Sequence, residues 1–136
     1  SVVNWGSKAS PGITLNLKAS PGDQCVGIAF EFPNDSQVST LLDYLHKREG
    51  CNPTTLLIKL LDRRTVEALV YIYQGSNLLD PNASVVEKVA MVRKARGKSG
   101  SAVDYVRKNF EGLQAAGLED SAVTELWEAI LAHKQG

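Results

Sequence analysis

Glu49 is the residue of this chain whose type and position best suit proton transfer. A helical apolar pattern ends at Leu45 and Gly50 directly follows Glu49, so the carboxylate is expected at the C-terminal end of a helix. An acid at that end opposes the helix dipole, which means that helix stability does not explain its presence. General acid–base catalysis is one interpretation, and a solvated surface acid beside Lys47 and Arg48 is the other.

A cysteine and a histidine close to Glu49 offer a second chemical hypothesis. His46 and Cys51 could pair as base and nucleophile, but one is expected inside the helix and the other beyond its end. Their spacing therefore does not ensure contact. Cys25 and Cys51 are the two cysteines of a chain without a secretory signal, so both are expected to be free thiols in a reducing cytoplasm.

Two segments in the second half of the chain could bind an anion. Arg93, Lys94 and Arg96 could hold a phosphate or carboxylate, or could complement the C-terminus of a helix. The GKSG segment, Gly97–Gly100, could present backbone N–H groups as a cradle for an anion or carbonyl, or could be an ordinary turn between helices.

The common signatures of metal, nucleotide and nucleophile sites are absent. The sequence has no CxxC, HxxxH, GxSxG or Walker motif, and no GxGxxG after a strand. Only two histidines are present, and no carboxylates can be placed with them. We therefore expect no metal site.

Composition narrows the class of protein. A length of 136 residues favours one domain over residues 1–136 with its own apolar core. Fifteen basic and fifteen acidic residues cancel, so no net field attracts nucleic acid or an anionic membrane. No apolar run approaches the ~20 residues of a membrane helix. These features predict a cytoplasmic protein whose partners are neither nucleic acid nor a membrane.

The first half of the chain predicts strands around one helix. Alternating apolar residues predict strands at 13–17 and 25–32, and an amphipathic pattern predicts a helix at 37–48. Two β-rich runs at 54–61 and 65–73 flank a polar turn, which indicates an antiparallel hairpin. Tyr71 and Tyr73 share one face of the second run and are expected to pack at a core edge with their hydroxyls in water.

The second half predicts three helices. Ser84 and Glu87 have the spacing of a capping box, Ser101 precedes another amphipathic segment, and Ser121 opens the last one. Strands followed by helices favour an α+β fold.

Four segments together resemble the ChaC-type γ-glutamylcyclotransferases: GIAFEF at Gly27–Phe32, KREG at Lys47–Gly50, ALVYIY at Ala68–Tyr73 and GKSGSAVDYV at Gly97–Val106. The resemblance implies a small mixed or antiparallel β-barrel with flanking helices, and conversion of glutathione or another γ-glutamyl compound to 5-oxoproline without metal or cofactor. It implies that Glu49 is the catalytic acid and base, and that Ser99, Gly100 and Tyr105 bind the substrate.

Two departures from the family pattern suggest an alternative. The family's opening strand and Tyr-Gly-Ser-Leu loop have no counterpart after Ser1, and Ala102 stands where the family usually has Asn. A barrel without its first strand would expose a strand edge, which predicts a homo-oligomer joined through that edge. The alternative function is therefore a non-catalytic ligand-binding or assembly module that kept the fold.

Overall fold

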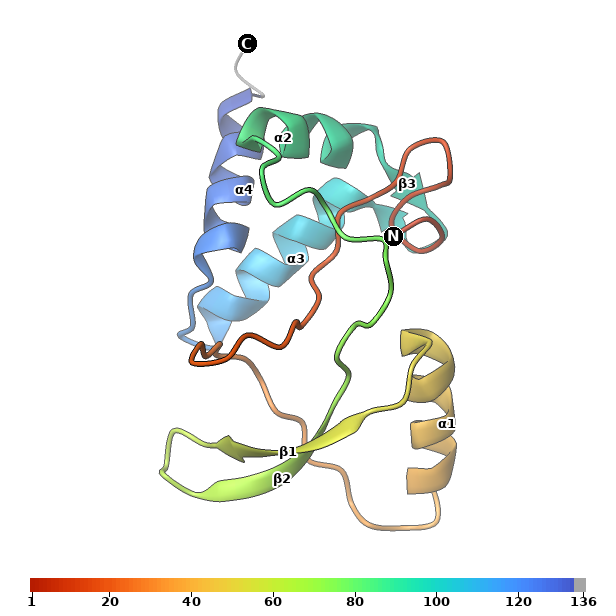
Figure 1. Ribbon diagram of the computed structural model, residues 1–136, viewed down its shortest axis with the longest axis vertical. Coiled ribbons are helices and arrows are strands. Elements are labelled where there is room, and N and C mark those ends of the chain that lie inside the picture. The colour runs from red at the N-terminus through yellow and green to blue at the C-terminus, as the bar shows by residue number, and fades with distance from the viewer. Residues whose placement is uncertain (134–136) are drawn as a thin grey trace. The chain divides into compact units, whose positions relative to one another are not determined.

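The structure, a computed structural model that describes residues 1–133, contains four helices and two two-stranded antiparallel sheets (Figure 1). This confirms the predicted α+β class. The chain divides into two compact units. The helical unit comprises Ser1–Leu15, Cys25–Gly27 and the chain from Asn77 onward, and the hairpin unit comprises Asn16–Gln24 and Ile28–Ser76. The single domain over residues 1–136 stays a prediction, and residues 134–136 lie outside the described part.

Three helices form the core of the helical unit: α2 (Val85–Lys94), α3 (Ala102–Ala115) and α4 (Ser121–Ala132), which Figure 1 shows in green, cyan and blue. Their facing sides bury small and branched apolar residues, and Val92 and Ile130 are completely enclosed. The rest of this buried cluster is Val89, Ala95, Ala102, Val106 and Leu126. Close packing of such side chains supplies the main stabilisation of the unit.

Side-chain caps determine where these helices begin. The predicted capping box is present, since the Ser84 hydroxyl accepts from the Glu87 N–H and the Glu87 carboxylate accepts from the Ser84 N–H. Ser101 caps α3 as predicted, and its hydrogen bond to the Asp104 carboxylate lowers the pKa of Asp104. The cap of α4 is Asp120, one residue before the predicted start.

A short ribbon precedes α3 in the helical unit. Its strands are β3 (Arg96–Gly97) and β4 (Gly100–Ser101), joined by the Lys98–Ser99 turn. The N-terminal segment lies against this turn, because the N–H groups of Lys98 and Ser99 donate to the carbonyls of Val3 and Asn4 at 2.9 and 2.8 Å. Any side chain at Gly97 would meet the backbone of Val3 and Asn4, so this approach requires glycine.

The hairpin unit consists of α1 (Val38–Glu49) and the β1 (Thr54–Lys59) and β2 (Thr65–Val70) hairpin. The register pairs Thr54 with Val70 and Lys59 with Thr65. The helix α1 and the antiparallel hairpin of β1 and β2 both agree with the sequence predictions. Gly50 ends α1 with φ +69°, a left-handed conformation that glycine adopts without strain.

The predicted strands at 13–17 and 25–32 are wrong, because these segments have no assigned strand in residues 1–133. A single parallel bridge pairs Leu17 with Ile72. Apolar side chains of the second segment remain exposed, including Phe30 at 76 %. Alternation alone does not make a strand, since its backbone also needs a neighbouring strand. The predicted barrel stays a prediction, because the two sheets described are each two-stranded.

None of the helices within residues 1–133 has the length and apolar character needed to cross a membrane.

Candidate active site

Glu49 is the last residue of α1, as the sequence predicts. The N–H of Gly50 donates to the carbonyl of His46 at 2.9 Å and closes the final turn of the helix. The Glu49 carboxylate lies 3.4 Å from the Arg48 guanidinium, and the two side chains are 37 % and 60 % exposed. Ion pairs this exposed hold their partners weakly. The backbone of Glu49 is therefore held in the last turn of α1. Its carboxylate can still leave the Arg48 ion pair and bind a ligand.

Two contacts of the hairpin unit join the end of α1 to the chain just after β2. The His46 ring lies edge-on to the Tyr71 ring, with 6.0 Å between the ring centroids. On the other side of Glu49, the Cys51 thiol lies 3.9 Å from the carbonyl oxygen of Ile72, a weak S–H hydrogen bond. Glu49 thus lies in the sequence between His46, which contacts Tyr71, and Cys51, which contacts Ile72.

The Tyr71 hydroxyl corrects an expectation from the sequence. It is buried and has no hydrogen-bond partner within residues 1–133, whereas we expected it to be in water. Burial raises the pKa of Tyr71, and the nearby charge of Glu49 and then that of Cys51 raise it further. The alternation of residue types gives no signal that the surroundings of Tyr71 would close around its hydroxyl.

The nucleophile hypothesis for His46 and Cys51 gains no support from the described residues. Hydrogen bonds within residues 1–133 include none between these two side chains, and the thiol faces the Ile72 carbonyl instead. Cys25 and Cys51 are both free thiols. The hairpin unit therefore provides a carboxylate, a thiol and a phenol at the end of α1, without a base placed to activate the thiol.

Tyr105 lies on α3 in the helical unit. Its hydroxyl accepts a hydrogen bond from the Leu15 N–H at 3.1 Å, and its ring packs on Trp5 with 5.1 Å between centroids. It also lines an apolar cavity of about 140 Å³ together with Ile13, Leu15 and other side chains of this unit. The hydroxyl still has its own proton to donate, so the predicted role in substrate binding is chemically available.

Ser99 and Gly100 lie against the N-terminal segment at Asn4 and Trp5. A side-chain atom at Gly100, where φ is +131°, would lie 3.3 Å from the Trp5 ring, and the Ser99 N–H donates to the carbonyl of Asn4. Within the helical unit, Gly100 and Tyr105 thus share Trp5 as a neighbour, whereas Ser99 contacts the preceding residue, Asn4. Trp5, which packs on the Tyr105 ring, was not among the site residues predicted from the sequence.

The proposed N–H cradle at Gly97–Gly100 is partly occupied by the protein itself. Two of its donors, the N–H groups of Lys98 and Ser99, bind carbonyls of the N-terminal segment. These donors are not free for a ligand in this structure. Whether Glu49 of the hairpin unit shares a site with Ser99, Gly100 and Tyr105 stays a prediction.

In the cation cluster at the end of α2, Arg93 has a structural role. The Arg93 guanidinium donates to the Ile130 carbonyl at 3.2 Å, which joins the end of α2 to α4. An arginine at a helix C-terminus also complements the helix dipole. The structural interpretation of Arg93 therefore accounts for its position.

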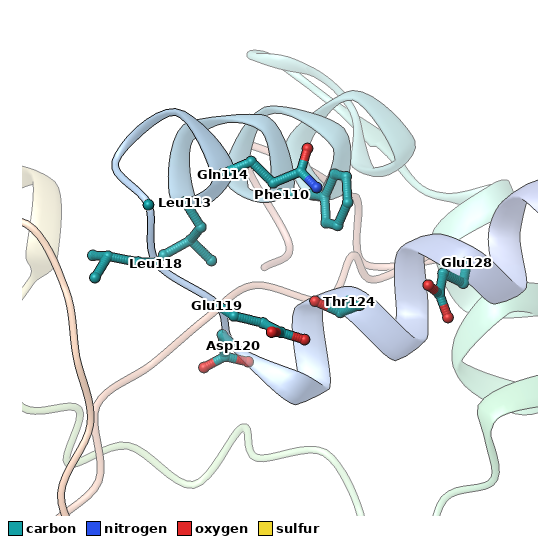
Figure 2. Close-up of a pocket in the computed structure, with 9 residues that line it drawn as sticks. Phe110, Leu113, Gln114, Leu118, Glu119, Asp120, Thr124 and Glu128 are labelled. Carbon is teal, nitrogen blue, oxygen red and sulfur yellow. The ribbon is translucent and has the colours of Figure 1, made fainter.

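A surface hollow of about 540 Å³ lies between the end of α3 and α4 (Figure 2). Figure 2 shows acidic and amide groups beside apolar side chains: Phe110, Leu113, Gln114, Leu118, Glu119, Asp120, Thr124 and Glu128. None of the predicted site residues lines it. Asp120 is engaged as the cap of α4. Across residues 1–133, no three histidine, cysteine or acidic side chains are grouped closely enough to hold a metal ion.

Comparison with known proteins gives one family. The family described as ChaC-like protein matches residues 1–133 of this chain. The match includes Glu49 of the hairpin unit and Ser99, Gly100 and Tyr105 of the helical unit. No curated protein matches the chain significantly.

Proposed function

The chain belongs to the ChaC-like protein family, and from this premise we propose that it is a γ-glutamylcyclotransferase. Its substrate is glutathione or another γ-glutamyl compound, and its products are 5-oxoproline and the released amine. The observation that carries the proposal is the accessible Glu49 carboxylate at the capped end of α1, whose only ion-pair partner in residues 1–133 is an exposed arginine. Such a cyclisation needs one carboxylate that can accept a proton and return it.

The chemistry requires proton transfer but no protein nucleophile. The neutral α-amine of the substrate attacks its own γ-carbonyl carbon, and Glu49 accepts the proton that this nitrogen loses. A bond then breaks between the γ-carbon and the amide nitrogen of the leaving group. Glu49 returns its proton to that nitrogen, so 5-oxoproline and the free amine leave with no net change at the enzyme. A metal or cofactor is not needed for any of these steps.

Orientation of the substrate accounts for the rest of the proposed catalysis. A γ-glutamyl chain is flexible, and holding its amine against its γ-carbonyl removes much of the entropic barrier to ring closure. Ser99, Gly100 and Tyr105, which lie against Asn4 or Trp5 of the N-terminal segment, are proposed to hold the substrate.

The direct test is product formation by the 136-residue chain. Incubation with glutathione should release 5-oxoproline and cysteinylglycine in a one-to-one ratio, measured by chromatography with mass detection. A chain that accumulates neither product from glutathione or from other γ-glutamyl dipeptides would contradict the proposal. Release of glutamate instead of 5-oxoproline would indicate hydrolysis, which requires an attacking water rather than cyclisation.

A specific observation favours assembly as a second role. The alternating segment at 26–32 exposes four large apolar side chains, with Val26 at 59 %, Ile28 at 53 %, Phe30 at 76 % and Phe32 at 52 %. Water contacts with such a stripe are unfavourable, and an unpaired extended backbone can accept another strand. We therefore propose that copies of the chain pair through this segment.

A further inference from the structure

The Tyr71 hydroxyl is the buried polar group that the mechanism above does not use. It has no hydrogen-bond partner in residues 1–133 and is closed off from solvent. Buried polar groups without partners are rare in folded proteins because their lost hydration is not replaced. A group of this kind beside a candidate catalytic residue therefore indicates a ligand that completes its hydrogen bonding.

Its position near Glu49 rests on two contacts. The Tyr71 ring meets the His46 ring edge-on, one helical turn before Glu49, and the adjacent Ile72 carbonyl meets the Cys51 thiol two residues after Glu49. Both contacts lie within the hairpin unit. They hold Tyr71 beside the end of α1.

The hydroxyl can act only as a proton donor or a neutral acceptor at physiological pH. Burial and the charge of Glu49 raise the pKa of Tyr71, so the phenol stays protonated. Glu49 does not take this proton as a hydrogen-bond acceptor, because the hydroxyl has no partner among the described residues. The phenol thus keeps a donor that no described residue uses, close to the Glu49 charge.

We propose, resting on the γ-glutamylcyclotransferase function above, that the Tyr71 hydroxyl donates a hydrogen bond to the γ-carbonyl oxygen of the bound γ-glutamyl compound. Negative charge develops on that oxygen when the α-amine adds to the carbonyl carbon, and a preorganised donor stabilises the charge. The phenol keeps its proton throughout, so Glu49 alone moves protons.

The test compares Tyr71→Phe with Tyr44→Phe, which removes the hydroxyl of a tyrosine that is 58 % exposed on α1. Tyr71→Phe should lower kcat for 5-oxoproline release by ~10²–10³-fold, the usual effect of removing one oxyanion donor, with a smaller change in KM. Its Tm should not fall, because an unpaired buried hydroxyl contributes no stabilising bond. Tyr44→Phe should match the parent in kcat, KM and Tm.

A second measurement separates this inference from the function on which it rests. Glutathione is added to each variant and the rise in Tm is recorded, which reports binding without turnover. If the parent turns glutathione over and Tyr71→Phe keeps the parental kcat, the donor role is overturned and the function stands. If the parent releases no 5-oxoproline but glutathione raises the Tm of the parent and Tyr44→Phe and not of Tyr71→Phe, the function fails and Tyr71 remains a ligand donor.

The remaining outcomes overturn the donor role. They are an equal rise in Tm for all three proteins without turnover, or no rise and no turnover in the parent. A Tyr71→Phe variant that fails to fold would also contradict it, because the hydroxyl would then have a partner within the protein.

Discussion

The ring of His46 lies edge-on against the ring of Tyr71, with 6.0 Å between their centroids. Through this contact the last turn of α1 is held to the chain beyond β2, and Glu49 is the residue that this turn ends on. A helix C-terminus without such a contact would fray and would move the carboxylate. The pair therefore links the packing of the hairpin unit to the candidate chemistry.

Removing the His46 ring should loosen this link. His46→Ala is expected to lower the free energy of unfolding by about 1 kcal/mol, the typical value of an aromatic pair beyond simple burial. Urea unfolding followed by circular dichroism measures the change. His133→Ala, at the exposed C-terminal end of α4, is the matched control and should leave stability unchanged. Equal stability of both variants and the parent would show that the ring contact contributes nothing.

Burial of the Tyr71 hydroxyl should be visible in a pH titration. The folded pKa of Tyr71 is raised above the ordinary value of 10.0, chiefly by burial and then by the charges of Glu49 and Cys51. Because the folded state favours the protonated phenol, it loses stability relative to the unfolded state as pH rises from about 10 through the folded pKa. The groups facing the phenol are His46, Glu49 and Cys51.

The measurement is phenolate absorbance in the parent and in Tyr71→Phe. The difference between the two curves isolates one of the four tyrosines and should rise above pH 10. Above that pH the parent should also lose more stability than Tyr71→Phe does. A difference curve centred at or below pH 10 would mean that the hydroxyl is in water.

Cys51 should be dispensable for activity, although it lies two residues from Glu49. Its thiol contacts the Ile72 carbonyl, and a serine hydroxyl can donate to the same oxygen. Cys51→Ser is therefore expected to retain the parental kcat for 5-oxoproline release. Cys25→Ser, at an exposed position, serves as the control. Loss of turnover in Cys51→Ser with an unchanged Tm would instead revive the pairing of His46 with Cys51.

Self-association should depend on the exposed segment at 26–32. We expect light scattering to give a mass above that of one 14.7 kDa chain, rising with protein concentration. Phe30→Ser should shift the mass towards the monomer, because Phe30 is 76 % exposed in the unpaired segment. Leu61→Ser removes a side chain that is 92 % exposed in the hairpin turn and should not change the mass. A monomer at all concentrations counts against this mode of assembly.

The sequence predicted best those elements that local signals define. The capping box of Ser84 and Glu87, and the stop at Gly50, depend on residues within one helical turn, so α1 and α2 were predicted closely. The hairpin of β1 and β2 could also be predicted from the sequence, because its strands are joined by a short turn. The segment at 25–32 was not, since a strand there depends on a partner that its own residues do not specify.

The candidate site shows the same division. Glu49 could be placed at a helix end from the sequence, and Tyr105 on a helix, because both statements concern local structure. The burial of the Tyr71 hydroxyl, and the use of the Ser99 N–H by Asn4, arise from contacts between distant parts of the chain. Residue spacing within a short segment does not predict such contacts.

If Glu49 moves the protons of cyclisation, Glu49→Gln should lose most of its kcat. Glutamine keeps the size of the side chain but cannot titrate, so 5-oxoproline release from glutathione should fall by at least ~10²-fold. Stability should change by no more than about 0.5 kcal/mol, because the side chain is partly exposed and its ion pair is weak. Asp43→Asn, which neutralises an exposed acid on the same helix, should retain the parental kcat. Glu49→Gln releasing 5-oxoproline at the parental rate would contradict the account.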